Sequence, residues 1–424
     1  MGKVRLCDTF AKGNMLCFKD YIAITGDKII FSACNYNGLY QYNRENNQLS
    51  FLGNFIGENM AMKALHSKIV QYNQWYIFIP YYAKTIGIFD MESNSFSSMK
   101  LPLPKYACHS GAKFQMAEWY KDKLYLLPEN YSYILEIDFT QNQFNMYDDW
   151  NEEKIIYQPN IETGFAMGWR DGERFVYLPL AGCNKIMKFD LESKEYEFIS
   201  VKTECTGFRT LTSIESVFYA TDENGKIIRF QKNGEKVKII GEYGTKFWKS
   251  IEIEERYLVL FANDADAILV IDAKNEEQYF HGSGDTIDSG DYDNWEHNRL
   301  WFVKEVGNKK IAYMNREDRT IKIIKVNADK KICVSSKKVI CDDTKNADYE
   351  IDIAEFYDLW LDYHNEVTRT LHYRKPFILS EKFSTEDTLH FIFNLLYKGN
   401  LQGKQKQNNK KEIGYVIWKG LKCI

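Results

Sequence analysis

The chain has 424 residues and a formal net charge of −4, and 15% of its residues are aromatic. This charge balance excludes a general attraction to nucleic acid or to acidic membrane surfaces. No apolar run reaches the roughly 18 residues that a membrane-spanning helix needs, and only seven residues are proline. An aromatic-rich composition of this kind favours β-strands, because rings pack well on half-buried pleated surfaces.

The cysteines favour a reducing compartment. All nine are scattered along the chain and none forms a CxxC pair, whereas a disulfide framework favours an even, clustered set. The N-terminal segment contains no apolar stretch of the length that a signal peptide needs. We therefore expect a cytoplasmic protein with reduced thiols.

In chain order, the first predicted element is a short run at Val4–Cys7, which is a candidate strand for closing a ring. A first repeat follows, with predicted strands at Lys28–Ser32, Leu39–Tyr42 and Leu49–Leu52. Polar turn residues separate these runs, as a meander of antiparallel strands requires.

A phrase then recurs three times: a Tyr-rich strand that ends in Pro, a polar link, and a strand that ends in Asp. Its end residues are Pro80 and Asp90, Pro128 and Asp138, and Pro179 and Asp190. The prolines are 48 and 51 residues apart and the aspartates 48 and 52, which is a period typical of strand-built repeats. Proline suits a strand end because it has no N–H, and Asp can accept hydrogen bonds from the turn that follows. We therefore expect these aspartates, and Asp272 in a later repeat, to be structural.

Three further repeats are predicted around Ser216–Phe230, Tyr257–Asp272 and Arg299–Lys325. Seven four-stranded units predict an all-β fold, a seven-bladed β-propeller, which protects strand edges by radial repetition. Six blades remain possible. A β-sandwich with an accessory sheet is the alternative, and the fixed period disfavours it. We place the propeller at residues 1–345.

Residues 346–424 have a different pattern. Apolar residues recur at helical spacing from Ile351 onward, and Ser384 with Asp387 resembles a capping box at the start of a second helix. We expect a C-terminal α-helical tail that packs on the propeller or on a partner, since its apolar faces are too strong to be left in water.

Catalytic signatures are absent from the sequence. It has no P-loop, GxGxxG, HExxH or GxSxG motif, and we predict no cofactor and assign no catalytic residue. If the protein is an enzyme, the candidates are residues just before the first strand of a repeat, near the mouth of a propeller's central channel. These are His66, His109, Arg209 and Lys246. Ordinary polar loop residues are the competing interpretation.

The links between the second and third strands open on the same face and are rich in Tyr and Asn. Tyrosine offers rigid contact area with a polar tip, and Asn offers both a donor and an acceptor, which suits carbohydrate or peptide recognition. Asn is also a routine turn residue, so a structural interpretation stays open. With Trp248 from the preceding group, the predicted ligand-binding residues are Asn35, Tyr36, Tyr81, Tyr82, Asn130, Tyr131, Asn184, Asn224, Asn263 and Trp248.

Residues 281–296 form the longest Gly- and Asp-rich loop. Asp288, Asp291 and Asp293 offer carboxylate oxygens of the kind that bind a hard cation such as Ca²⁺. Their spacing does not match an EF-hand loop, so we predict a mobile acidic loop and no metal site.

The repeat resembles those of kelch-like propellers and of the central domain of galactose oxidase, through its aromatic strand, Pro, and Ile-x-x-Phe-Asp pattern. It lacks the double glycine of kelch repeats, where Pro stands instead. Its composition is also similar to that of uncharacterised propeller proteins of low-GC Gram-positive bacteria. The resemblance implies the fold and no catalytic residue, because no Tyr, Tyr, His and His copper-ligand set is found.

Our functional hypothesis is a non-catalytic recognition or scaffold propeller. Its top face binds a glycan, a peptide or a partner protein, without nucleic acid and without a membrane span. The alternative is an enzyme (a lyase, hydrolase or transferase) that acts on a carbohydrate or modified peptide in the central channel.

Overall fold

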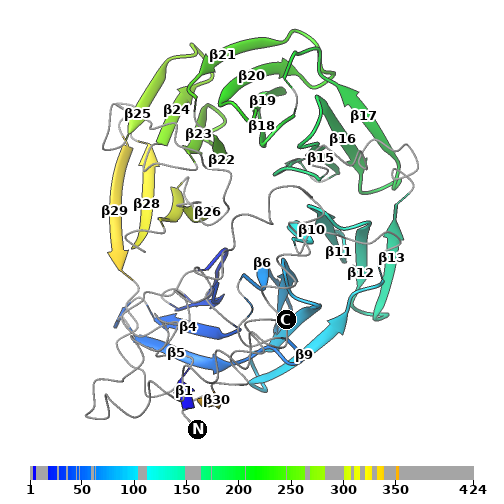
Figure 1. Ribbon diagram of the computed structural model, residues 1–424, viewed down its shortest axis with the longest axis vertical. Coiled ribbons are helices and arrows are strands. Elements are labelled where there is room, and N and C mark those ends of the chain that lie inside the picture. Colours follow the sequence, from blue (N-terminus) through cyan, green and yellow to red (C-terminus); the bar gives the residue numbers. More distant parts are fainter. Residues whose placement is uncertain are drawn as a thin grey trace, which may run out of the picture.

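The computed structural model describes residues 3–5, 18–25, 28–34, 37–43, 45–46, 48–58, 62, 64–103, 112–148, 164–172, 174–205, 207–244, 246–262, 268–281, 300–306, 310–315, 320–326, 332–338 and 350–352. Seven four-stranded antiparallel sheets are arranged around one axis as the blades of a β-propeller (Figure 1). The predicted seven-bladed fold is therefore confirmed. None of the described residues is helical, so the described part of the chain has no helix that could cross a membrane.

Each blade takes its four strands from consecutive stretches of the chain, with the first strand nearest the axis and the fourth at the rim (Figure 1). Blades one to three comprise β2 (Ile22–Thr25), β3 (Lys28–Ser32), β4 (Leu39–Asn43), β5 (Gln48–Gly53); β6 (His66–Tyr72), β7 (Trp75–Pro80), β8 (Thr85–Asp90), β9 (Ser95–Lys100); and β10 (Phe114–Tyr120), β11 (Lys123–Pro128), β12 (Ile134–Asp138), β13 (Gln143–Tyr147). Blades four to seven comprise β14 (Trp169–Asp171), β15 (Phe175–Pro179), β16 (Lys185–Asp190), β17 (Tyr196–Ser200); β18 (Thr210–Ile214), β19 (Val217–Thr221), β20 (Lys226–Gln231), β21 (Lys238–Glu242); β22 (Phe247–Ile253), β23 (Tyr257–Ala262), β24 (Ile268–Asp272), β25 (Gln278–His281); and β26 (Leu300–Val306), β27 (Lys310–Asn315), β28 (Thr320–Val326), β29 (Ile332–Lys338).

Among the described strands, the ring is not closed by a strand shared between the chain ends. A strand does form near the predicted position, β1 (Lys3–Arg5), but it pairs with β30 (Glu350–Asp352) in a separate two-stranded sheet (Figure 1). Blade seven draws all four of its strands from one stretch of chain, so the predicted role of Val4–Cys7 in that blade is wrong. β30 lies within the region for which a helical tail is predicted; the rest of that region lies outside the described residues.

Side chains close the ring instead. Lys304 on β26 donates from Nζ to Oδ1 of Asp20 at 2.7 Å and to the carbonyl oxygen of Tyr21 at 2.6 Å. Asp20 in turn accepts the backbone N–H of Ile69 at 2.8 Å through Oδ2. These contacts join blades seven, one and two.

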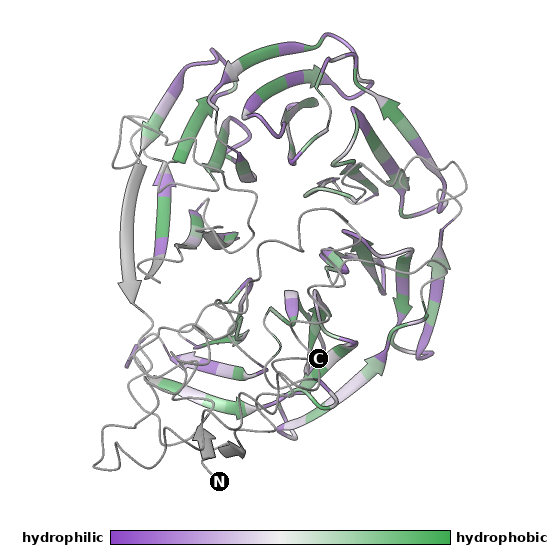
Figure 2. Ribbon diagram, viewed as in Figure 1, coloured by the Kyte–Doolittle hydropathy of each residue, from purple (hydrophilic) through white to green (hydrophobic). Residues whose placement is uncertain are grey.

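The core lies between the blades. Most residues of the second and third strands are buried, whereas the rim strands mix exposed and partly buried residues. Figure 2 shows the middle strands as largely hydrophobic. Apolar side chains from adjacent blades form shared clusters, as with Ile77 and Ile79 of blade two against Leu124 and Leu126 of blade three. Each blade therefore needs its neighbours to bury its faces.

The recurring Pro and Asp residues have the structural roles predicted for them. Pro80 is the last residue of β7, as Pro128 is of β11 and Pro179 of β15. Asp90 accepts the backbone N–H of Glu92 at 2.9 Å in the turn that follows its strand. Asp138, Asp190 and Asp272 make the same contact in their own blades.

A repeated backbone hydrogen bond joins neighbouring blades on one face. A residue shortly before the first strand of one blade donates its N–H to the link between the second and third strands of the preceding blade. The bonds are Ala64 to Cys34 at 3.0 Å, Lys113 to Tyr81 at 2.9 Å, Phe165 to Glu129 at 2.8 Å, and Phe208 to Leu180 at 3.2 Å. Gly207 permits the last of these, because a Cβ there would overlap the carbonyl of Ala181. We call this face, where both groups of predicted site residues lie, the upper face.

Candidate functional site

Several predicted site residues lie outside the described residues. These are His109, Asn35, Tyr36, Asn263, Asp288, Asp291 and Asp293. Within the described ranges, no group of three or more His, Cys, Asp or Glu side chains is placed to hold a metal ion.

His66 is enclosed between blades one and two. Only 4% of its surface is exposed, and its Nδ1 lies 2.8 Å from the hydroxyl oxygen of Ser32. The rings of Phe55 and Phe78 pack on it with centroid separations of 4.3 and 5.4 Å. Burial lowers the pKa of His66 to about 3, so the ring is neutral at physiological pH. This geometry favours a structural role over contact with a ligand.

Arg209 and Lys246 come together, as their equivalent positions predict, but they share one counter-ion. That counter-ion is Glu223, in the upper link of blade five. Arg209 donates to its Oε2 at 2.6 Å, and Nζ of Lys246 lies 3.5 Å from the same oxygen. The neighbouring Asn224 uses its backbone N–H to contact Asp222 within the turn. Glu223 therefore offsets one of the two positive charges of this pair.

Other predicted upper-face residues are engaged in the scaffold. Asn184 donates from Nδ2 to the carbonyl oxygens of Val201 at 2.9 Å and Thr203 at 3.3 Å, which ties the ends of its own blade together. Tyr131 is buried, and its hydroxyl donates to the carbonyl of Pro102. Trp248 packs against the apolar cluster between blades six and seven.

Tyr81 and Asn130 keep features suited to a ligand. Nζ of Lys19 lies 3.6 Å from the centroid of the Tyr81 ring, a cation–π contact. Tyr82 packs edge-on to Tyr81 with centroids 4.7 Å apart. Nδ2 of Asn130 is buried and has no hydrogen-bond partner among the described residues. Lys19 directly precedes Asp20 in the chain, so Tyr81 lies near the start of blade one, whereas Asn130 lies beside Gly164, before the first strand of blade four.

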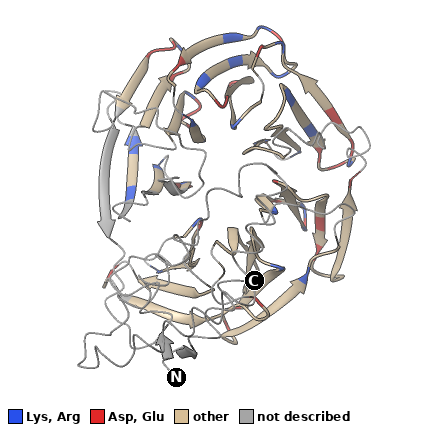
Figure 3. Ribbon diagram, viewed as in Figure 1, with Lys and Arg blue, Asp and Glu red and all other residues tan. Residues whose placement is uncertain are grey.

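Six charged side chains, one from each of six blades, gather around the axis. They lie on the inner strands or, for Asp20, just before one; Figure 3 shows charged positions on these strands. We call them the axial cluster, which comprises Asp20, Lys68, Glu118, Arg170, Lys249 and Lys304.

Two carboxylates hold most of the axial cluster together. Glu118 pairs with Nζ of Lys68 at 3.1 Å and with Arg170 at 3.2 Å, so it links blades two, three and four. Lys68 also donates to the carbonyl oxygen of Ala117 at 2.8 Å. Asp20 pairs with Lys304 as described above. Four cations face two carboxylates, a formal surplus of two positive charges (4 − 2).

Lys249 is the member without a counter-ion. It is half-buried, and no hydrogen bond or ion pair joins its Nζ to any described residue. The pKa of Lys249 is lowered to about 8, mainly by burial and also by the charge of Lys68, while Glu118 and Asp20 oppose the shift. Those three residues belong to blades two, three and one, whereas Lys249 belongs to blade six. Its ammonium group therefore acts across the axis.

A β-bulge precedes each of Lys68 and Lys249. The ladder slips between His66 and Lys68, and again between Phe247 and Lys249. Such a slip re-aims the side chains next to it. The two lysines are opposite Ile79 and Phe261, each the penultimate residue of its second strand. They occupy equivalent positions of the repeat, a signal that reasoning from the sequence missed because a β-bulge leaves no clear mark in a single sequence.

No family model and no curated protein matches the chain. Solved structures resemble it in fold. A streptogramin B lyase aligns with a TM-score of 0.53 and 12% identity, over 76% of this chain and 94% of the lyase. Virginiamycin B lyase from Staphylococcus aureus aligns with a TM-score of 0.51 and 13% identity, over 74% and 95%.

An extracellular domain assigned to a hybrid two-component system of B. thetaiotaomicron is also similar, with a TM-score of 0.53 and 10% identity. The match covers 75% of this chain and 39% of that longer chain. At such identities the likeness shows the fold alone. The fold of this chain is a seven-bladed β-propeller.

Proposed function

We propose that the protein is a recognition propeller whose axis binds an anionic group of a ligand. The observation that carries this proposal is the axial cluster, in which both carboxylates are engaged and Lys249 has no counter-ion among the described residues. A half-buried charge without a partner is unfavourable, and an anion would supply the missing partner. Perturbed lysines of this kind concentrate at functional sites.

The ligand that suits this site combines an anionic group with a surface for Tyr81. An acidic glycan, a peptide carboxylate or a phosphorylated compound shares the required anion. The rest of the ligand would extend from the axis towards the upper face, where Lys19 covers the Tyr81 ring. On the same face, Asn130 offers a buried amide donor that has no partner among the described residues.

The second candidate is an enzyme that acts on a carbohydrate or modified peptide. One observation favours it: the lowered pKa leaves part of Lys249 as a neutral amine near pH 8, which is able to act as a base or nucleophile. Among the proteins of similar fold, a catalytically inactive virginiamycin B lyase has been solved with quinupristin. Replacement of Lys249 by Arg separates the two candidates, since Arg keeps the charge but neither donates nor accepts a proton at neutral pH.

The test is ligand-induced thermal stabilisation at constant ionic strength, because salt screens exposed charges. The probes are inorganic phosphate, citrate, glucose 6-phosphate and glucuronate, with glucose as the neutral control. We expect at least one anion to raise the Tm of the wild-type protein and to lose this effect in Lys249→Met. The matched control is Lys246→Met, which removes a lysine already paired with Glu223. Equal stabilisation of Lys249→Met and wild type, or none by any anion, would contradict the proposal.

We also propose that the protein is cytoplasmic and that its repeats are kelch-like. The free thiols of Cys183 and Cys205 are compatible with a reducing compartment. The predicted tail at residues 346–424 would supply a second contact surface. Deleting residues 353–424, which leaves β30 intact, tests this role, and unchanged stability and ligand binding would argue against it.

A further inference from the structure

Lys249 has the surroundings of a nucleophilic amine. It follows a β-bulge on an inner strand, is half-buried, and makes no hydrogen bond or ion pair with any described residue. The nearby carboxylates of Glu118 and Asp20 are already engaged by Lys68, Arg170 and Lys304. A lysine becomes nucleophilic when it is desolvated or lies beside another cation, and Lys249 meets both conditions.

We infer that Lys249 captures the carbonyl carbon of a 2-oxo acid as an imine. This rests on the proposed function, since the surplus cations of the axial cluster would hold the carboxylate. In a 2-oxo acid the carboxylate is bonded directly to the carbonyl carbon, so one compact site serves both groups. A neutral ketone has no carboxylate for these cations to bind, so it would react with Lys249 more slowly.

The reaction balances without an oxidant or reductant. The lone pair of the neutral amine forms a C–N bond to the carbonyl carbon, and the carbonyl oxygen takes up a proton to give a carbinolamine. Loss of that oxygen as water breaks the C–O bond and leaves the imine. The net change is amine plus ketone to imine plus water, with solvent water carrying the protons.

The supply of neutral amine distinguishes Lys249 from an ordinary lysine. Burial and the charge of Lys68 lower its pKa to about 8, whereas an unperturbed lysine titrates near 10.4. At pH 8 about half of Lys249 is therefore neutral, against less than about 1% of an exposed lysine. The charged groups that act on it are Lys68, Glu118 and Asp20.

The experiment is reductive trapping of the full chain with pyruvate and sodium cyanoborohydride at pH 8, followed by intact-mass analysis and peptide mapping. We expect one adduct per chain, formed at Lys249 at least about tenfold faster than at exposed lysines. Lys249→Arg should lose this adduct while keeping the anion-induced rise in Tm. Lys246→Arg should label as the wild type does. Acetone, matched in size but uncharged, should label Lys249 at least about tenfold more slowly than pyruvate.

The outcomes separate this inference from the proposed function. If Lys249 is labelled no faster than the exposed lysines while anions still raise the Tm, the imine is wrong and the binding site stands. If anions have no effect on the Tm and pyruvate does not label Lys249, both are wrong. Equal rates with acetone and pyruvate would overturn the assignment to 2-oxo acids. The labelling rate should rise through about pH 8, and a rise only near pH 10.4 would contradict an activated amine.

Discussion

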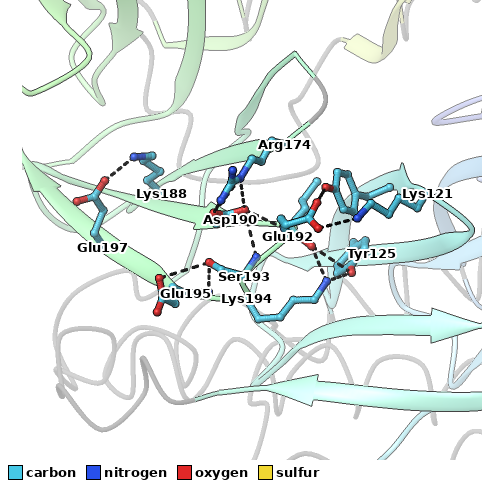
Figure 4. Close-up of polar contacts among 12 residues, drawn as sticks. Lys121, Tyr125, Arg174, Lys188, Asp190, Glu192, Ser193, Lys194, Glu195 and Glu197 are labelled. Carbon is cyan, nitrogen blue, oxygen red and sulfur yellow. Dashed lines mark hydrogen bonds and ion pairs between the residues drawn. The ribbon is translucent and has the colours of Figure 1, made fainter.

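Charged side chains are paired differently between blades three and four and at the axis. Between blades three and four lies a set of side chains that we call the interblade network: Lys123, Tyr125, Glu136, Arg174, Asp190 and Lys194. Figure 4 shows part of it, with Arg174 against Asp190 and Lys194 reaching Tyr125. The axial cluster is built from the same residue types at similar depth, so the two regions can be compared directly.

In the interblade network every charge has partners. The side chain of Glu136 is 1% exposed and accepts from Lys123 at 2.6 Å, Lys194 at 2.9 Å and Asn145 at 2.8 Å. Tyr125 also donates to it. Burial alone would raise the pKa of Glu136, but these hydrogen bonds outweigh burial and hold it well below its usual range.

At the axis the pairing is incomplete. Glu118 and Asp20 are satisfied, but Lys249 has no counter-ion among the described residues. Complete pairing is what the fold needs for stability, whereas an unpaired charge lowers stability and persists when something else requires it. This difference supports our proposal that a ligand binds at the axis rather than at the more elaborate interblade network.

The largest effect should come from breaking the interblade network. Glu136→Gln keeps the volume but leaves Lys123 and Lys194 without their anion, and we expect a loss of about 2–4 kcal/mol in the free energy of unfolding. Urea denaturation measures it. The control is Glu197→Gln, which removes an exposed partner of Lys188 and should change stability by less than about 0.5 kcal/mol. Anion binding at the axis should be unchanged in both variants, and similar losses in the two would show that the network contributes no more than a surface pair.

At the axis, we expect a substitution to raise the free energy of unfolding rather than lower it. Lys249→Met removes an unpaired charge and should raise the free energy of unfolding by about 1–3 kcal/mol at pH 7. The folded-state pKa of Lys249, about 8, lies below its unfolded value. The unfavourable contribution is therefore fully present below pH 8 and is relieved as pH rises towards about 10.4. The advantage of the variant should shrink across that range.

Urea denaturation at pH 7, 8.5 and 10 tests this, with Lys188→Met as the control for a lysine that already has a partner in Glu197. The wild-type curve should converge on that of Lys249→Met as pH rises. Parallel curves, or a variant less stable than the wild type at pH 7, would mean that Lys249 has a partner in the folded protein.

Periodicity explains why most of the fold could be predicted. Pro80, Pro128 and Pro179 recur at nearly constant spacing because each ends a second strand, and that local constraint repeats with the blade. The pairing of β1 with β30 could not be found in this way. Each strand has only three residues, and the partners are far apart in the chain.

The face shared by the predicted residues could be read from the sequence. Residues before the inner strands and in the upper links do share one face, as the hydrogen bond from Lys113 to Tyr81 shows. Their partners could not be read from the sequence, since Glu223 neutralises Arg209 and Lys246 only through the fold. The axial lysines were missed because their direction depends on a β-bulge, which leaves no clear signal in a single sequence.

The smallest effect separates two aspartates at equivalent positions of the repeat. Asp90 and Asp190 both accept turn N–H groups, but only Asp190 also binds Arg174, whose Nε lies 2.8 Å from its Oδ1. The Arg174 guanidinium holds the pKa of Asp190 well below its usual range. Asp190→Asn keeps an oxygen for the turn and loses the charge, so it should lower the free energy of unfolding by about 0.5–1 kcal/mol at pH 7.

Asp90→Asn should leave stability unchanged within error, since its oxygen still accepts from the turn. The depressed pKa of Asp190 means that its contribution is present above its unfolded pKa and is lost as pH falls below that value. The gap between the two variants should therefore close in acid. Equal losses in the free energy of unfolding at pH 7 would show that the turn contacts, and not Arg174, account for the stabilisation. The Arg174–Asp190 pair would then no longer distinguish the interblade network from the axis.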